Sequence, residues 1–252
     1  MIPRHTVDGE DAAEAIVFSN SLGTTMGMWE PQVEALSGRY RLVRYDTRGH
    51  GRTPTTGGAF GIDDLADDVA DLLDHLEIER AHLVGVSLGG ATVLDFAARH
   101  PGRTGRVAAL CTAPRIATAE YWAERVKQVR AHGMAALAEA VAPRWFTERF
   151  GRERPEVVRR FRRDLAACDP LGYTACCRVL GEMDLRGALA AIEAATLVLY
   201  GTEDAITTGD DARAIAAGVP DCRVTAIEGA AHLASAERAD SVNRSLIEHF
   251  SC

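Results

Sequence analysis

The stretch AHLVGVSLGGATVLDFAAR, residues 81–99, decides the fold of this 252-residue chain. Its first six residues are apolar and predict a short buried strand, and the residues from 88 onward predict a helix with small residues in its first turn. The motif GVSLG therefore places Ser87 on a tight turn between strand and helix, with its hydroxyl exposed above the sheet edge. We expect strained φ/ψ angles at Ser87, and glycines beside it because the neighbouring backbones approach closely. Ser87 is thus a candidate nucleophile, and an idle serine on a glycine-rich turn is the alternative.

A candidate acid and a candidate base follow this serine in the chain. The segment LVLYGTED, residues 197–204, is an apolar strand that runs into an acidic loop. The segment CRVTAIEGAAH, residues 222–232, is a second strand followed by small residues and a histidine. The order serine, aspartate, histidine is the one found where a nucleophile follows a strand–turn–helix motif. It predicts a catalytic triad of Ser87, Asp204 and His232.

Other acids and histidines receive structural interpretations. Glu203 is the alternative acid, but the register of strand and loop favours Asp204. Asp210 and Asp211 are expected to cap a helix that starts at Ala212. His50 lies in the turn DTRGHG, and we expect it to brace that loop. The remaining histidines have no visible partner in the sequence or lie on predicted helices: His5, His75, His82, His100, His132 and His249.

The third component of such a site is an oxyanion hole. Residues 15–20, AIVFSN, predict a strand, and a loop of small residues follows it at 21–25. One backbone N–H is supplied by the loop after this strand and one by the residue after the nucleophile. The two donors are therefore predicted to be Leu22 and Leu88. Their placement depends on the shape of the loop more than on its side chains.

Composition limits the classes of protein that this chain can represent. It is 47% hydrophobic and 25% charged, with a net charge of −8, which argues against a nucleic-acid partner. The sequence contains no run of about 18 consecutive apolar residues, so we expect no membrane span. The start MIPRH lacks the apolar run of a secretory signal. The six cysteines show no metal or disulfide spacing. We therefore expect a cytoplasmic enzyme with reduced thiols that needs neither a metal nor an organic cofactor. A homo-oligomer is compatible with the sequence.

Strands and helices alternate along most of the chain, which predicts an α/β fold with a mostly parallel sheet covered on both faces. A first, antiparallel strand is expected near residues 4–8. The other predicted strands lie near residues 16–20, 41–45, 81–86, 106–112, 195–200 and 222–227, and the helices near 29–37, 63–76, 88–99, 210–217 and 235–250.

Residues 115–185 interrupt this alternation. They contain no convincing strand and predict a helical cap, or lid, inserted into a core formed by residues 1–114 and 186–252. Because the insertion follows the strand at 106–112, it would lie over the carboxyl ends of the strands and cover Ser87. The predicted lid helices are 119–132, 134–142, 154–167 and 172–181.

Five stretches carry a resemblance to a known family: NSLGTTMGMW (20–29), RYDTRGHG (44–51), GVSLGG (85–90), RWFT (144–147) and GAAHL (229–233). On these stretches the chain resembles the 3-oxoadipate enol-lactonases (β-ketoadipate enol-lactone hydrolases) of the α/β-hydrolase superfamily, and the resemblance covers essentially its whole length. The residues Asn20-Ser21 limit the choice of family within the superfamily, because most of its members carry His-Gly at these two positions. The resemblance implies the α/β-hydrolase fold, with the lid inserted after strand 6 of that fold.

The implied activity is hydrolysis of 3-oxoadipate enol-lactone to 3-oxoadipate through an acyl-enzyme, in aromatic catabolism by the β-ketoadipate (protocatechuate) pathway. Three other functions fit the same residues. A generic carboxylesterase or perhydrolase would prefer neutral esters, and a carbon–carbon bond hydrolase would use the triad on a dienoic diketone. A small-molecule receptor on a hydrolase fold would turn over slowly or not at all.

The implied partner is a small-molecule lactone that carries a carboxylate, and a buried carboxylate needs an arginine or several N–H donors. The lid offers Arg115, Arg130 and Arg144, of which Arg144 is the first choice; Arg48 lies in a core loop. Trp122 and Trp145 could form walls around the flat ring, although ordinary packing between lid helices explains them equally well.

Overall fold

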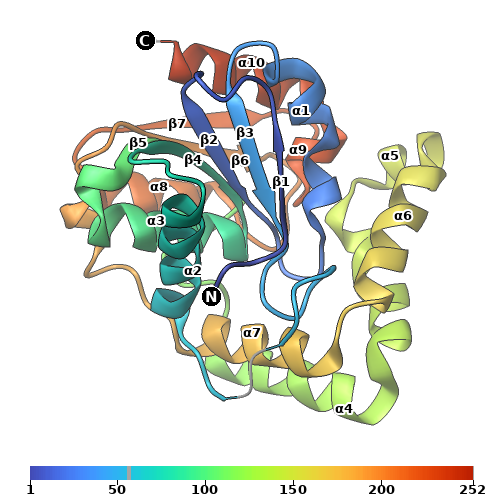
Figure 1. Cartoon of the computed structure of the whole chain (residues 1–252). Helices are drawn as coiled ribbons and strands as arrows, with labels where there is room; N and C mark the ends of the chain where they lie inside the picture. Colours follow the sequence, from blue (N-terminus) through green and yellow to red (C-terminus); the bar gives the residue numbers. More distant parts are fainter. Residues whose placement is uncertain (56–57, 252) are drawn as a thin grey trace.

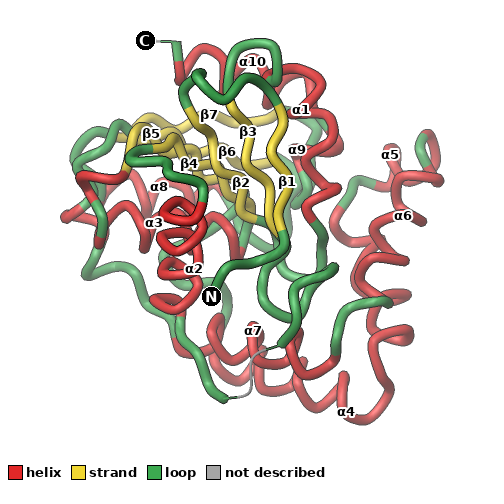
Figure 2. The backbone as a smooth tube through the Cα atoms, in the orientation of Figure 1, coloured by secondary structure: helices red, strands yellow, loops and turns green. Residues whose placement is uncertain are grey.

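A computed structural model describes residues 1–55 and 58–251 and contains one seven-stranded sheet (Figures 1 and 2). The strand order is β1-β3-β2-β4-β5-β6-β7, and every neighbouring pair is parallel except β1 with β3. The predicted α/β architecture, including the antiparallel first strand, is confirmed. The strands are β1 (His5–Asp8), β2 (Ala15–Ser19), β3 (Arg41–Tyr45), β4 (Ala81–Val86), β5 (Thr104–Leu110), β6 (Thr196–Gly201) and β7 (Cys222–Ile227).

Helices cover both faces of this sheet, because a parallel sheet has apolar side chains on both sides. All five residues of β2 are buried. In Figure 1, α1 (Glu30–Leu36), α9 (Ala234–Glu237) and α10 (Ala239–Phe250) lie together on one side. On the other side lie α2 (Ile62–His75), α3 (Leu88–Arg99) and α8 (Gly209–Gly218).

Two predicted helix boundaries are corrected. The single helix expected at 235–250 is two helices, α9 and α10, because the backbone leaves the helical region at Arg238 with φ −126° and ψ 48°. Helix α8 begins at Gly209 and not at Ala212. Asp211 does cap it, since its carboxylate accepts a hydrogen bond of 2.7 Å from the backbone N–H of Thr208.

The segment between β5 and β6 is helical and contains α4 (Ala119–Val141), α5 (Glu148–Glu153), α6 (Pro155–Ala166) and α7 (Pro170–Glu182). Figure 1 shows these helices as a separate layer beside one end of the sheet. The insertion follows β5, the strand expected near residues 106–112, which is the fifth strand of the described sheet in chain order. Two predicted lid helices are joined in α4, which is broken between them by Gly133 at φ 76°.

Candidate active site

Ser87 lies on the predicted tight turn between β4 and α3. Its backbone has φ 58° and ψ −116°, so the expected strain is confirmed. A Cβ atom on Gly85 would lie 2.1 Å from the carbonyl oxygen of Gly89, and one on Gly89 would lie 2.1 Å from that of Ser19. Glycine is therefore required at both positions, because the turn presses α3 against β4 and β2. This packing holds Ser87 at the amino-terminal end of α3.

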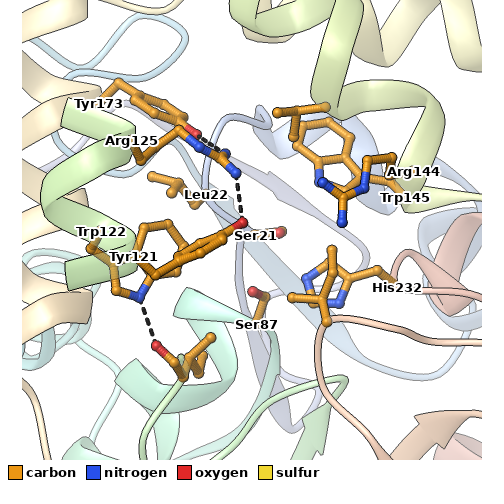
Figure 3. A pocket seen from close by; sticks show the side chains of 13 residues that line it. Ser21, Leu22, Ser87, Tyr121, Trp122, Arg125, Arg144, Trp145, Tyr173 and His232 are labelled. Carbon is orange, nitrogen blue, oxygen red and sulfur yellow. Dashed lines mark hydrogen bonds between the residues drawn. The ribbon is translucent and has the colours of Figure 1, made fainter. Parts of the chain in front are cut away.

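His232 and Asp204 form a hydrogen-bonded pair at the carboxyl ends of β7 and β6. The distance between His232 Nδ1 and Asp204 Oδ2 is 2.9 Å, and both residues are buried. An ionised carboxylate only accepts hydrogen bonds, so it fixes the ring proton on Nδ1 and leaves Nε2 as a proton acceptor. Figure 3 shows His232 and Ser87 side by side in the same cavity.

Asp204 is held as a carboxylate in this buried place. Burial alone would raise its pKa, but the charge and hydrogen bond of His232 and hydrogen bonds from Ile206 and Thr207 outweigh burial, so its pKa lies below the ordinary value. The Thr207 hydroxyl donates to Oδ2 at 2.7 Å, and the backbone N–H of Ile206 donates to Oδ1 at 2.8 Å. Asp204 therefore orients the His232 ring.

The loop after β2 is anchored by buried hydrogen bonds. The Asn20 side chain donates to the carbonyl of Tyr45 at 2.7 Å and accepts from the indole of Trp29 at 2.8 Å. The backbone N–H of Gly23 donates to His50 Nε2 at 2.9 Å. Leu22 lies between these anchors and lines the cavity. Leu88 is the first residue of α3, where an N–H group has no acceptor within its own helix.

His50 has a bracing role, as expected from the sequence. Its Nδ1 lies 3.0 Å from the carbonyl oxygen of Arg48, so the ring proton is on Nδ1 and Nε2 accepts from Gly23. Burial lowers the pKa of His50 and keeps the ring neutral, as this acceptor role requires.

Ser87 and His232 open into a small cavity with a volume of about 40 Å³ (Figure 3). Core loops supply part of its wall and the segment between β5 and β6 supplies the rest, including Trp122, Arg144 and Trp145 from the predicted substrate contacts. The lining residues are Ser21, Leu22, Ser87, Ile116, Tyr121, Trp122, Arg125, Val141, Arg144, Trp145, Tyr173, Ile206 and His232.

The four arginines considered from the sequence differ sharply in position. Arg144 lines the cavity and is exposed. Arg115 and Arg130 are exposed and do not line the cavity. Arg48 forms an ion pair with the buried carboxylate of Asp68, with Nε 2.5 Å from Oδ2.

Sequence reasoning missed a fifth arginine, Arg125, which is buried in the cavity wall. Its guanidinium donates to the phenol oxygens of Tyr121 at 2.6 Å and Tyr173 at 3.2 Å. Helical periodicity could have found it, because Tyr121, Trp122 and Arg125 are spaced to lie on one face of α4.

A second missed residue is Glu237, a buried carboxylate that joins the insertion to the loop of His232. It accepts hydrogen bonds from the backbone N–H of Thr147 at 3.1 Å, from the Thr147 hydroxyl, and from the backbone N–H of Ala231 at 2.9 Å. The backbone N–H of Leu233 also donates to the carbonyl of Trp145 at 3.0 Å. The wall of the cavity and the catalytic histidine candidate are thus fixed to each other.

Within residues 1–55 and 58–251, no helix has the length and apolar character needed to cross a membrane. The same residues contain no group of three or more histidine, cysteine, aspartate or glutamate side chains placed to hold a metal ion.

Comparison with known proteins identifies the family. Residues 14–239 match the family model of the alpha/beta hydrolase fold. The chain is 37% identical to 3-oxoadipate enol-lactonase 2 of Acinetobacter baylyi, over 94% of this chain and 89% of the relative. The crystal structure of the enol-lactonase from Burkholderia xenovorans LB400 superposes with a TM-score of 0.96 at 39% identity, covering 99% of this chain and 96% of that one. A thermophilic esterase from Thermogutta terrifontis superposes with a TM-score of 0.91 at 27% identity, covering 97% and 91%. The chain is therefore an ester-hydrolysing enzyme with the α/β-hydrolase fold, and it belongs to the 3-oxoadipate enol-lactonase family.

Proposed function

We propose that the enzyme hydrolyses 3-oxoadipate enol-lactone to 3-oxoadipate with Ser87, His232 and Asp204 as its catalytic triad, in aromatic catabolism by the β-ketoadipate pathway. The observation that carries the proposal is the pair of His232 and Asp204, 2.9 Å apart, beside a serine on a strained turn in one cavity. The names of the two enol-lactonase relatives support this substrate.

In the first step the Ser87 Oγ attacks the lactone carbonyl carbon while Nε2 of His232 takes the hydroxyl proton. Asp204 stabilises the imidazolium that forms. The carbonyl oxygen becomes an oxyanion, and the backbone N–H groups of Leu22 and Leu88 donate to it. Each such donor contributes about 3–4 kcal/mol to stabilisation of the transition state.

Collapse of this intermediate breaks the ring ester bond and leaves the acyl group on Ser87. The leaving group is an enolate, which is a better leaving group than an alkoxide; it takes the proton from His232 and tautomerises to the ketone. A water molecule then gives a proton to His232 and attacks the acyl carbonyl. The second tetrahedral intermediate expels Ser87, which recovers its proton, and 3-oxoadipate is released. No metal or organic cofactor has a part in these steps.

The insertion supplies the proposed substrate contacts. Residues 115–185 act as a cap over the core formed by residues 1–114 and 186–252. Trp122 and Trp145 form walls for the flat lactone ring, and the indole of Trp122 is oriented by its 2.6 Å hydrogen bond to the carbonyl of Ile116. Arg144 is exposed on the cavity and attracts the anionic lactone towards it.

We place this reaction in the cytoplasm, on a small-molecule substrate, without a nucleic-acid or membrane partner. The five described cysteines are free, which fits a reducing compartment. A homo-oligomer is compatible with this function.

The test is a direct comparison of substrates with the purified enzyme. We expect kcat/KM for 3-oxoadipate enol-lactone to exceed that for neutral short-chain aryl esters by at least about 100-fold, because buried donors left unpaired by a neutral ligand cost binding energy. Equal rates on both would indicate a generic esterase. Tight binding with fewer than about one turnover per minute, far below typical enzyme rates, would indicate a receptor.

A further inference from the structure

Arg125 is a buried cation without a buried anion beside it. Its side chain lies in the cavity wall and the residue is 8% exposed. Among the described residues, no aspartate or glutamate forms an ion pair with it, whereas the half-buried Arg48 is paired with Asp68. A guanidinium stays charged at any pH that proteins meet, and burying it without a counter-charge is unfavourable. The position therefore requires an explanation beyond packing.

The surroundings of Arg125 partly compensate its charge. Its Nη1 and Nη2 atoms donate to the phenol oxygens of Tyr173 and Tyr121. The guanidinium carbon also lies 5.3 Å from the ring centre of Tyr121 and 6.0 Å from that of Trp122, within the range of cation–π attraction. These groups are neutral, so the positive charge is oriented but not neutralised.

The arrangement also leaves hydrogen-bond donors for a ligand. A guanidinium has five N–H groups, and the two phenols accept from two of its nitrogens. Because the Tyr121 oxygen accepts from Arg125, the hydroxyl proton of Tyr121 remains available to donate. In Figure 3 the Tyr121 ring extends from α4 into the cavity that Ser21 and Ser87 also line. A fork of N–H donors beside an O–H donor is the pattern that binds a carboxylate.

We propose that Arg125, with the hydroxyl of Tyr121, forms the binding site for a free carboxylate on the substrate. The inference deepens the proposed function and rests on it where it assigns this site to the carboxylate of the enol-lactone. Arg125 is favoured over Arg144 because a buried guanidinium is screened less by water and salt than an exposed one. Arg144 then serves to attract the anion, and Arg125 holds it.

The experiment compares two aryl esters of adipate that differ in whether the distal carboxylate is free or methylated. They are 4-nitrophenyl hydrogen adipate, which carries a free carboxylate, and 4-nitrophenyl methyl adipate, in which that carboxylate is masked. The ratio of their kcat/KM values is measured for the wild type, Arg125→Met, Arg144→Met and Arg130→Met. The last variant is the matched control, because Arg130 lies on the same helix, is exposed and does not line the cavity.

We expect the wild type to prefer the anionic ester and Arg125→Met to lower the ratio by about 10- to 100-fold, mainly through KM, as loss of hydrogen bonds to a charged group predicts. Tyr121→Phe should lower it less, and Arg130→Met should leave it unchanged. Adipate should competitively inhibit the wild type and inhibit Arg125→Met at least tenfold more weakly. Melting temperatures show whether each variant is folded.

Three results would overturn the proposal. A ratio that survives Arg125→Met and is lost in Arg144→Met would place the carboxylate at the exposed arginine. A fall of both rates together, with unchanged inhibition by adipate, would make Arg125 a structural residue. A wild type without preference for the anionic ester would remove the carboxylate site. Failure of the proposed function is separate: the wild type would then not hydrolyse the enol-lactone, while the ratio for the aryl esters would still depend on Arg125.

Discussion

Glu237 gives a test of how the insertion and the catalytic centre are joined. Its two carboxylate oxygens accept from the backbone N–H and hydroxyl of Thr147 and from the backbone N–H of Ala231, all buried. In Glu237→Gln only one of these atoms remains an acceptor, so one backbone N–H must face an NH₂ group. A hydrogen bond to a charged group contributes about 1.5–3 kcal/mol, and we expect a loss of about 2–3 kcal/mol in the free energy of unfolding.

The assay is urea denaturation of the wild type, Glu237→Gln, Thr147→Val and the double variant. In a chain of this length the expected loss corresponds to a fall in melting temperature of roughly 5–10 °C. The two single changes should add less than fully, because both weaken the contact between Thr147 and Glu237. Thr147→Val also removes the hydrogen bond that the Thr147 hydroxyl accepts from the backbone N–H of Phe150. Glu228→Gln changes an exposed glutamate in the loop between β7 and α9 and serves as the control.

The activity of Glu237→Gln should fall as well, because Ala231 precedes His232. Small misplacement of a catalytic group lowers kcat by about tenfold to 100-fold. A change in unfolding free energy below about 0.5 kcal/mol, the range of ordinary surface substitutions, would refute the reasoning. So would strict additivity of the two single variants.

Three further predictions concern the triad and a buried histidine. Ser87→Ala should lower kcat by about 10⁴–10⁶ while the melting temperature is retained, and near-normal activity would move the nucleophile elsewhere. Asp204→Asn should lower kcat by about 10³–10⁴ through the wrong imidazole tautomer, whereas Glu203→Gln should be mild; the reverse ranking would reassign the acid. Burial lowers the pKa of His249 to about 4. As the pH falls from 7 to 4, His249 is therefore protonated more fully in the unfolded chain than in the folded chain. The free energy of unfolding of the wild type should then fall by about 3 kcal/mol more than that of His249→Gln. His132→Gln, at an exposed histidine, is the control.

The positions of Ser87, Asp204 and His232 at the ends of their strands could be predicted largely from the sequence because the signals are local. A strand, a turn and a helix around Ser87 are encoded within 19 consecutive residues, and the same holds for the strands that end at Asp204 and His232. The glycines on either side of Ser87 indicate a turn too tight for a Cβ atom at those positions, and a positive φ at Ser87 is expected in such a turn. Such features need no knowledge of distant contacts.

The part of the cavity wall that comes from the segment between β5 and β6 was harder to predict from the sequence. Arg125 is one of many lid arginines, and only the packing of α4 against α7 shows that it is buried next to Tyr173. Glu237 looks like a surface residue of an amphipathic helix until Thr147 is brought to it from 90 residues away. Pairings over such separations depend on how whole helices dock, which a local pattern does not encode.

The division of the cavity between two parts of the chain has a consequence for how new specificities arise. Of the thirteen described residues that line it, eight come from the single stretch between β5 and β6. One recombination event in that stretch can therefore replace most of the cavity wall. The codons for Ser87, Asp204 and His232 would be inherited unchanged. The hydrogen bonds between Thr147 and Glu237 limit such exchanges, because an incoming segment must supply hydrogen-bond donors at the position of Thr147. Among segments grafted between β5 and β6, those chosen because they supply donors to Glu237 should preserve esterase activity more often than those chosen by overall sequence similarity.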